Sequence, residues 1–153
     1  MRTRTTGLTL ALCFISAVVC FASPQLGTWK LNEAKSKLAP AAPKNHTVVY
    51  EAVGDDVKIT VDGTDVAGKP THNEWTGKFD GKDYPVVGDP NSDARSYTTV
   101  EGNTLEMTIK KGGKVTMTGR IAVSADGKTR TVTLNGTDAQ GQNFTSTAVY
   151  DKQ

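Results

Sequence analysis

The stretch TLEMTIKKGGKVTMTGRIAV, residues 104–123, alternates apolar and polar side chains on both sides of a double glycine. Leu105, Met107 and Ile109 are spaced two residues apart, and the second half of the stretch repeats this spacing. Because successive side chains of a β-strand point to opposite faces, the pattern predicts two strands, each with one buried and one solvated face. The two glycines can take the positive φ angles of a tight turn, so the stretch predicts an antiparallel hairpin.

The same pattern continues through the rest of the chain. Short alternating runs and glycine-containing turns succeed one another from Asn45 onward, which predicts about ten antiparallel strands. Such a meander leaves unpaired edges unless it closes, so we expect an all-β fold, a single antiparallel up-and-down β-barrel of about 8–10 strands, with the first strand beside the last. The expected strands lie near residues 27–31, 45–53, 57–62, 70–79, 83–87, 94–100, 104–110, 115–124, 129–135 and 143–150.

The first connection differs from the later hairpins. Asn32 is expected to cap a short helical turn through Lys37, which the linker with Pro40 and Pro43 then ends. We therefore expect a short helical turn in a crossover here.

The chain also contains an internal similarity. Residues 59–68 (ITVDGTDVAG) match residues 132–141 (VTLNGTDAQG) without gaps. A duplication and the convergence of two hairpins on one favourable turn both explain the match. Either explanation places the two turns at equivalent ends of the fold.

The first 22 residues have the pattern of an export signal. Arg2 and Arg4 precede an apolar run from Leu8 to Val19, and a small residue, Ala22, marks the expected cleavage site. We expect a signal peptide at residues 1–22 and one barrel domain at residues 23–153, exported to a periplasm or to the outside of the cell. The apolar run is about 12 residues long, too short to cross a bilayer, so no membrane insertion is expected after signal removal.

Removing the signal changes the charge and the thiol chemistry. Arg2 and Arg4 account for the whole formal charge of +2, so the remaining chain is neutral and offers no basic surface for nucleic acid. Cys13 and Cys20 are the two cysteines of the chain. The domain therefore has no disulfide and no thiolate chemistry.

Enzymatic chemistry is not indicated. His46 and His72 lie in polar strand segments typical of solvated side chains. Asp62-Gly-Thr-Asp65 and Asn135-Gly-Thr-Asp138 lack the ligand spacing of a calcium loop and are typical of turns. Asp55-Asp56 lies in a hairpin connection, where water opposes the pKa perturbation that acid–base catalysis needs. The sequence predicts no catalytic residue, no metal site and no cofactor.

Gly27-Thr-Trp29, followed by a crossover and a meander of hairpins, resembles the lipocalin-like (calycin) barrels. The resemblance implies that Gly27 and Trp29 belong to the closed floor of the barrel. Many members place an arginine over this tryptophan; Arg120 is a possible counterpart, but its parity in the strand points outward, so the assignment stays open. A second resemblance, to a group of small exported bacterial proteins without assigned function, spans nearly the whole chain after the signal. It rests on GTWKLN (27–32), AKSK (34–37), DGKDYPV (80–86), KKGGK (110–114) and VYDKQ (149–153).

The barrel interior is the candidate ligand site. Arg95 and Arg130 begin strands on the presumed inward face, and an arginine at the mouth of an apolar cup can pair with a ligand carboxylate. The alternatives are that each arginine extends to the rim or pairs with a nearby aspartate. Trp75 and Phe79 are expected in the core or in the cavity wall. The candidate ligand-binding residues are Trp75, Phe79, Tyr84, Arg95, Tyr97, Met107, Met117 and Arg130.

Two functions follow from this pattern. The first is an exported, non-enzymatic lipocalin-like protein that binds a small apolar or amphipathic ligand inside the barrel. The second is a protein-binding or inhibitor module with a filled barrel, acting through its outer surface and the loop at residues 83–93. That loop is long and contains two prolines, which is typical of a binding loop, a lid or a bulged corner. The two functions differ in whether the barrel is hollow, and the sequence specifies no protein partner.

Overall fold

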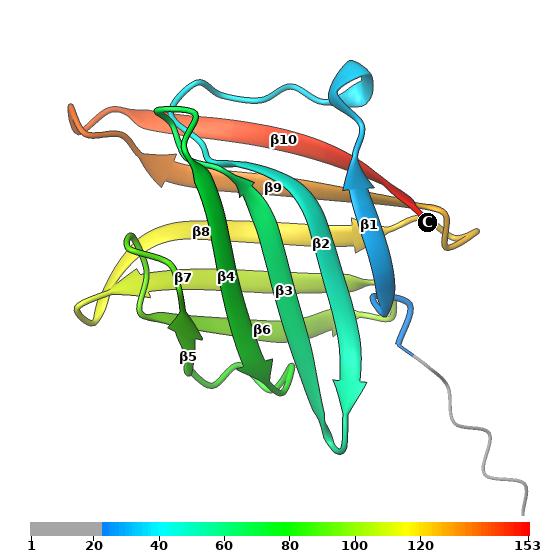
Figure 1. Ribbon diagram of the computed structural model, residues 1–153. Coiled ribbons are helices and arrows are strands. Elements are labelled where there is room, and N and C mark those ends of the chain that lie inside the picture. The colour runs from blue at the N-terminus through cyan, green and yellow to red at the C-terminus, as the bar shows by residue number, and fades with distance from the viewer. Residues whose placement is uncertain (1–22) are drawn as a thin grey trace, which may run out of the picture.

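The computed structural model describes residues 23–153, which form ten strands and one short 3-10 helix (Figure 1). The predicted export signal, with both cysteines, lies outside the described residues. No helix within residues 23–153 is long and apolar enough to cross a membrane. The elements are β1 (Gly27–Leu31), η1 (Glu33–Lys35), β2 (Lys44–Val53), β3 (Asp56–Thr64), β4 (Pro70–Gly77), β5 (Tyr84–Val87), β6 (Ala94–Glu101), β7 (Thr104–Lys111), β8 (Lys114–Val123), β9 (Thr129–Thr137) and β10 (Asn143–Lys152).

The strands follow one another around a closed antiparallel barrel, and β1 completes the ring beside β10 (Figure 1). Trp29 of β1 is paired with Val48 of β2 on one side and with Lys152 of β10 on the other. The predicted up-and-down barrel is therefore confirmed. The helical turn is shorter than predicted and ends at Lys35, because Lys37 forms a β-bridge with Thr147 of β10.

The interior follows the period of two that the sequence predicts. In β7, Leu105, Met107 and Ile109 are buried, and Glu106 between them is exposed. Burial of large apolar side chains contributes roughly 1.5–3 kcal/mol each, which is the main stabilisation available to a domain without disulfides. The inner faces of the strands thus form one continuous core.

The connections alternate between the two ends of the barrel, as an up-and-down meander requires. The crossover from β1 to β2 and the β3–β4, β5–β6, β7–β8 and β9–β10 connections lie at one end, and the other four lie at the opposite end. At the end with the β2–β3, β4–β5, β6–β7 and β8–β9 connections, Gln25 is buried. Its backbone oxygen accepts a hydrogen bond from Trp29 Nε1 at 2.8 Å. The segment before β1 therefore lies across this end and helps to close it.

The two similar segments, residues 59–68 and 132–141, have matching structures. Asp65 and Asp138 each accept hydrogen bonds at one carboxylate oxygen from the backbone N–H groups two and four residues further on, at 2.8–2.9 Å. The glycine three residues after each aspartate has a φ of 79° in both copies. The prediction that these motifs are turns at equivalent ends is confirmed, since both lie at the end to which the β1–β2 crossover belongs.

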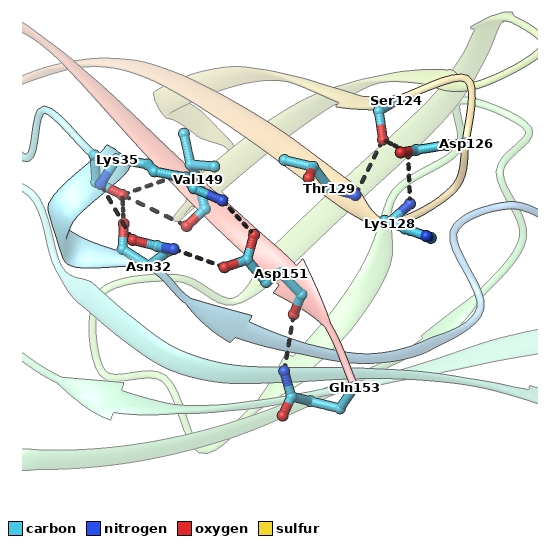
Figure 2. Close-up of polar contacts among 10 residues, drawn as sticks. Asn32, Lys35, Ser124, Asp126, Lys128, Thr129, Val149, Asp151 and Gln153 are labelled. Atoms are coloured by element: carbon cyan, nitrogen blue, oxygen red, sulfur yellow. Dashed lines mark hydrogen bonds and ion pairs between the residues drawn. The ribbon is translucent and has the colours of Figure 1, made fainter.

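Polar contacts fasten the first crossover to the last strand. Asn32 Nδ2 donates to Asp151 Oδ2 at 2.6 Å, and Lys35 Nζ lies 3.1 Å from Asp151 Oδ1 (Figure 2). The hydrogen bond from Asn32, and then that from Lys35, hold the pKa of Asp151 below its usual value. Figure 2 also shows the β8–β9 turn, in which Ser124 Oγ donates to Asp126 at 2.6 Å.

We expect Asp151→Asn to lower the melting temperature slightly at neutral pH and to have no such effect in acid. The folded-state pKa of Asp151 is depressed, so its carboxylate stabilises the fold above the unfolded-state pKa. This contribution is lost as the pH falls through the folded-state pKa. Thermal melts over a pH series check the prediction, with Asp55→Asn in the exposed β2–β3 turn as the control. A difference in melting temperature that is the same at every pH would contradict it.

Candidate functional site

The barrel is hollow. A cavity of about 810 Å³ extends from the interior to the end at which the crossover and the β3–β4, β5–β6 and β9–β10 connections lie. At the opposite end, Trp29 and Gln25 are completely buried and cover the floor. The cavity mouth is lined by Leu38, Ala41 and Pro43 of the crossover, Asp65 and Val66, residues 88–91, and residues 138–140.

The cavity wall is mostly apolar. Inward-facing side chains of β1–β4 and of β6–β10 supply it, and their alternation along each strand follows directly from the pleat. Tyr97, Met107 and Met117 lie in this wall, as their parity predicted. The apolar side chains of the wall are Leu31, Val48, Ile59, Val61, Met107, Ile109, Met117, Ile121, Val132, Leu134 and Ala148.

Three aromatic residues expected at the ligand site lie outside the cavity lining. Trp75 packs on Phe79, Tyr84 and Tyr97, with its ring centroid 4.7 Å from that of Tyr97 and 5.6 Å from that of Tyr84, and Phe79 also contacts Tyr97. The short strand β5 pairs with each neighbour at only two positions, so this sector of the wall has few backbone hydrogen bonds. Trp75 Nε1 donates to the backbone oxygen of Arg95 on β6 at 2.9 Å. The aromatic cluster therefore holds β4, β5 and β6 together. This is the core role given as one alternative for Trp75 and Phe79, whereas Tyr84 was expected only in the lining of the ligand site.

A buried arginine lies above the closed floor. Arg130 is 1% exposed, and its Cζ lies 5.1 Å from the ring centroid of Trp29 and 4.8 Å from those of Tyr50 and Tyr150. Each such cation–π contact contributes about 0.5–2 kcal/mol, most where water is excluded. Within residues 23–153, no carboxylate lies within 4.0 Å of Arg130, and its Nε and Nη1 have no hydrogen-bond partner. The three rings therefore stabilise a cation that has no counter-ion among the described residues.

The position of Arg130 corrects one expectation and resolves another. Its inward direction was predicted correctly, but its placement at the mouth was wrong, because the β8–β9 connection that precedes it lies at the closed end. The arginine over Trp29 is Arg130 and not Arg120. Arg120 points outward, is 53% exposed in its side chain, and lies 3.9 Å from Glu106.

Arg95 is the second buried cation of the cavity. It begins β6 directly after the β5–β6 connection and is 6% exposed. Asp89 is its one acidic neighbour in the described chain, with 3.6 Å between Arg95 Nη2 and Asp89 Oδ2. The Asp89 carboxylate already accepts hydrogen bonds from Ser92 Oγ at 2.6 Å and from the backbone N–H of Asn91 at 2.8 Å. Arg95 Nε has no hydrogen-bond partner within residues 23–153.

The tyrosines near the two arginines do not neutralise them. Burial raises the pKa of Tyr50 and of Tyr150, and the positive charge of Arg130 opposes this only in part. Both side chains are therefore neutral phenols that can donate a hydrogen bond. Tyr50 and Tyr150 were not singled out from the sequence, although the inward parity of Tyr50 with Val48 in β2 is a signal that could have identified it.

The histidines lie away from the cavity. His72 Nδ1 contacts Asp62 Oδ1 at 2.6 Å, and its Nε2 lies 3.8 Å from Glu74, all exposed side chains. His46 Nε2 lies 3.4 Å from the hydroxyl of Thr64. Within residues 23–153, no group of three or more histidine, cysteine or acidic side chains has the arrangement of a metal site.

No protein-family model matches this chain, and no curated protein matches it. The closed ten-strand barrel is compatible with a lipocalin-like architecture. The cavity is thus the feature from which function has to be inferred.

Proposed function

We propose that this protein binds a small apolar or amphipathic molecule inside its barrel. The observation that carries the proposal is the hollow interior, about 810 Å³ in volume, with an apolar wall and one open end. Binding sites for small molecules typically enclose roughly 300–1,000 Å³ and combine apolar walls with a few polar groups. The cavity meets both criteria, since Arg95 and Arg130 are the charged groups within its apolar wall.

Two further features support a binding protein rather than an enzyme. The resemblance of the Gly27-Thr-Trp29 motif and of the barrel to lipocalin-like proteins favours carriage of a ligand. The polar lining consists of two arginines, three tyrosines, three aspartates and several amide and hydroxyl side chains, Ser146 among them. No histidine, cysteine or lysine of the described residues lines the cavity to act as a base or nucleophile beside these hydroxyls. The export pattern of residues 1–22 suggests that binding takes place outside the cytoplasm.

The alternative, a protein-binding or inhibitor module, was predicted with a filled barrel. The cavity contradicts the filled interior. Residues 88–91 of the loop line the cavity mouth, so this part of the loop belongs to the entrance of the proposed ligand site. We therefore favour ligand binding over an interaction module.

The test is titration of the purified protein with a neutral apolar fluorophore, N-phenyl-1-naphthylamine. We expect its fluorescence to rise on binding and to saturate at one probe per protein, because the cavity is apolar and has a single mouth. Native mass spectrometry of protein purified gently from its own host should also show a bound small molecule. Absence of both a fluorescence change and a bound molecule would overturn the proposal.

A further inference from the structure

Two arginines and three aspartates line the cavity, and these opposite charges are not all paired with each other. Two of the three acidic residues in the lining, Asp65 and Asp138, use their carboxylates to hold the turns at the mouth. Asp89 is the third, and it stands beside Arg95 at a distance beyond that of a hydrogen bond. Arg130 has no carboxylate within 4.0 Å in residues 23–153. Asp89 is therefore the one carboxylate of the lining within 4.0 Å of an arginine in the described residues, and Arg130 is a buried cation without such a neighbour.

Some N–H groups of both arginines also have no hydrogen-bond acceptor within the described residues. Arg95 Nε, Arg130 Nε and Arg130 Nη1 are buried and have no hydrogen-bond partner within the described chain. Buried polar groups in folded proteins are nearly always paired, and buried charges are usually accompanied by an opposite charge. Since both side chains are more than nine-tenths buried and line the cavity, the missing acceptor would be supplied from the cavity itself.

We propose that Arg95 binds the anionic head of an amphipathic ligand and that the ligand class is apolar monocarboxylates. This inference rests on the proposed function, whose cavity it uses. A carboxylate is planar and accepts two parallel hydrogen bonds from a guanidinium group, so it matches an arginine with free donors. Its negative charge also brings an opposite charge into a cavity in which Arg130 has no carboxylate within 4.0 Å in residues 23–153, which a neutral head group would not do.

The surroundings of Arg95 suit such a head group. Tyr97 lies two residues further along β6 on the same inward face. Tyr50 lies close enough to both arginines for their positive charges to lower its pKa, against the larger effect of burial. Neutral phenols can add hydrogen bonds to a carboxylate without repelling it. Arg130 contributes its positive charge from the floor, where the three aromatic rings hold it. Arg95 is thus the arginine that is free to contact a head group, and Arg130 strengthens the favourable potential.

The apolar tail of the ligand has a wall to lie on. Met107, Ile121 and Val132 line the cavity on β7, β8 and β9. Burial of the methylene groups of the tail favours binding equally for an alcohol and an acid of the same chain length. The head group alone therefore distinguishes these two ligands.

The experiment compares hexadecanoic acid with hexadecan-1-ol as competitors of the neutral fluorophore, at concentrations below aggregation. For the wild type we expect the acid to displace the probe at about tenfold lower concentration or less, since a hydrogen bond to a charged group adds about 1.5–3 kcal/mol. In Arg95→Gln the acid should lose most of this advantage, because only the more distant charge of Arg130 remains to favour it over the alcohol. Arg120→Gln on the outer face is the matched control and should behave as the wild type.

The outcomes separate the two proposals. If the fluorophore and both competitors fail to bind the folded wild type, the proposed function is wrong. If acid and alcohol compete equally well in the wild type, the cavity binds ligands but the carboxylate inference is overturned. An undiminished preference for the acid in folded Arg95→Gln would overturn the role of Arg95. Circular dichroism verifies folding, and the wild-type comparison holds even if the variant fails to fold.

Discussion

Trp29→Ala is expected to lower the free energy of unfolding by about 3–5 kcal/mol, the range measured for deletion of a large aromatic side chain from a core. Trp29 is completely buried, and its Nε1 donates to the backbone oxygen of Gln25 at 2.8 Å. Its ring also forms one side of the aromatic surround of Arg130. The substitution removes the floor of the barrel, one cation–π contact and the hydrogen bond that fixes the segment before β1. Domains of this size have a total stability of about 5–15 kcal/mol, so the loss is a large fraction of it.

Urea or guanidinium unfolding followed by circular dichroism measures this loss. Trp29→Phe is the matched control, because it keeps an aromatic face beneath Arg130 but loses the Nε1 donor. We expect it to destabilise the barrel by clearly less than the alanine variant. If Trp29→Ala lowered the free energy of unfolding by less than about 0.5 kcal/mol, the usual range for surface substitutions, the tryptophan would not be the main support of the floor.

The fold could be predicted because its determinants are local. A period of two in residues 104–123 specifies which side chains enter the core, and the glycine turns specify where the chain reverses. Closure follows from the edges that an open meander would leave unpaired. Only details that depend on contacts far apart in the sequence differed, such as the end of the helical turn, which the bridge between Lys37 and Thr147 sets.

The site was predicted less well. The alternation along a strand tells whether a side chain points into the barrel, but not how far along the barrel axis it lies. Tyr97, Met107 and Trp75 all point away from solvent, yet the first two line the cavity and Trp75 packs in the wall. The position of a side chain along the barrel axis depends on the end of the barrel at which its strand begins. Arg95 follows a connection at the open end and Arg130 follows one at the closed end, a difference that strand counting in a meander would have given. Whether the interior is filled depends on the summed side-chain volumes and the barrel radius, which periodicity does not report.

Ala148→Trp is expected to weaken binding of the neutral fluorophore by at least about tenfold, equivalent to about 1.4 kcal/mol or more. Ala148 is a small residue of the cavity wall on β10, between the inward-facing Ser146 and Tyr150, so an indole at this position occupies the space proposed for the ligand. Overpacking a filled core usually costs about 1–3 kcal/mol, but here the added ring enters an existing hollow of about 810 Å³. We therefore expect the variant to remain folded.

Ala122→Trp is the matched control for this variant. Ala122 lies on β8 between Ile121 and Val123, both buried, so its own side chain points to the outer face. The same substitution there adds an equal apolar surface without entering the cavity, and probe affinity should stay at the wild-type value. Fluorescence titration of the three proteins makes the comparison. Equal affinities for all three would place the probe on the outer surface, because a ligand inside the barrel has to compete with the indole for the same volume.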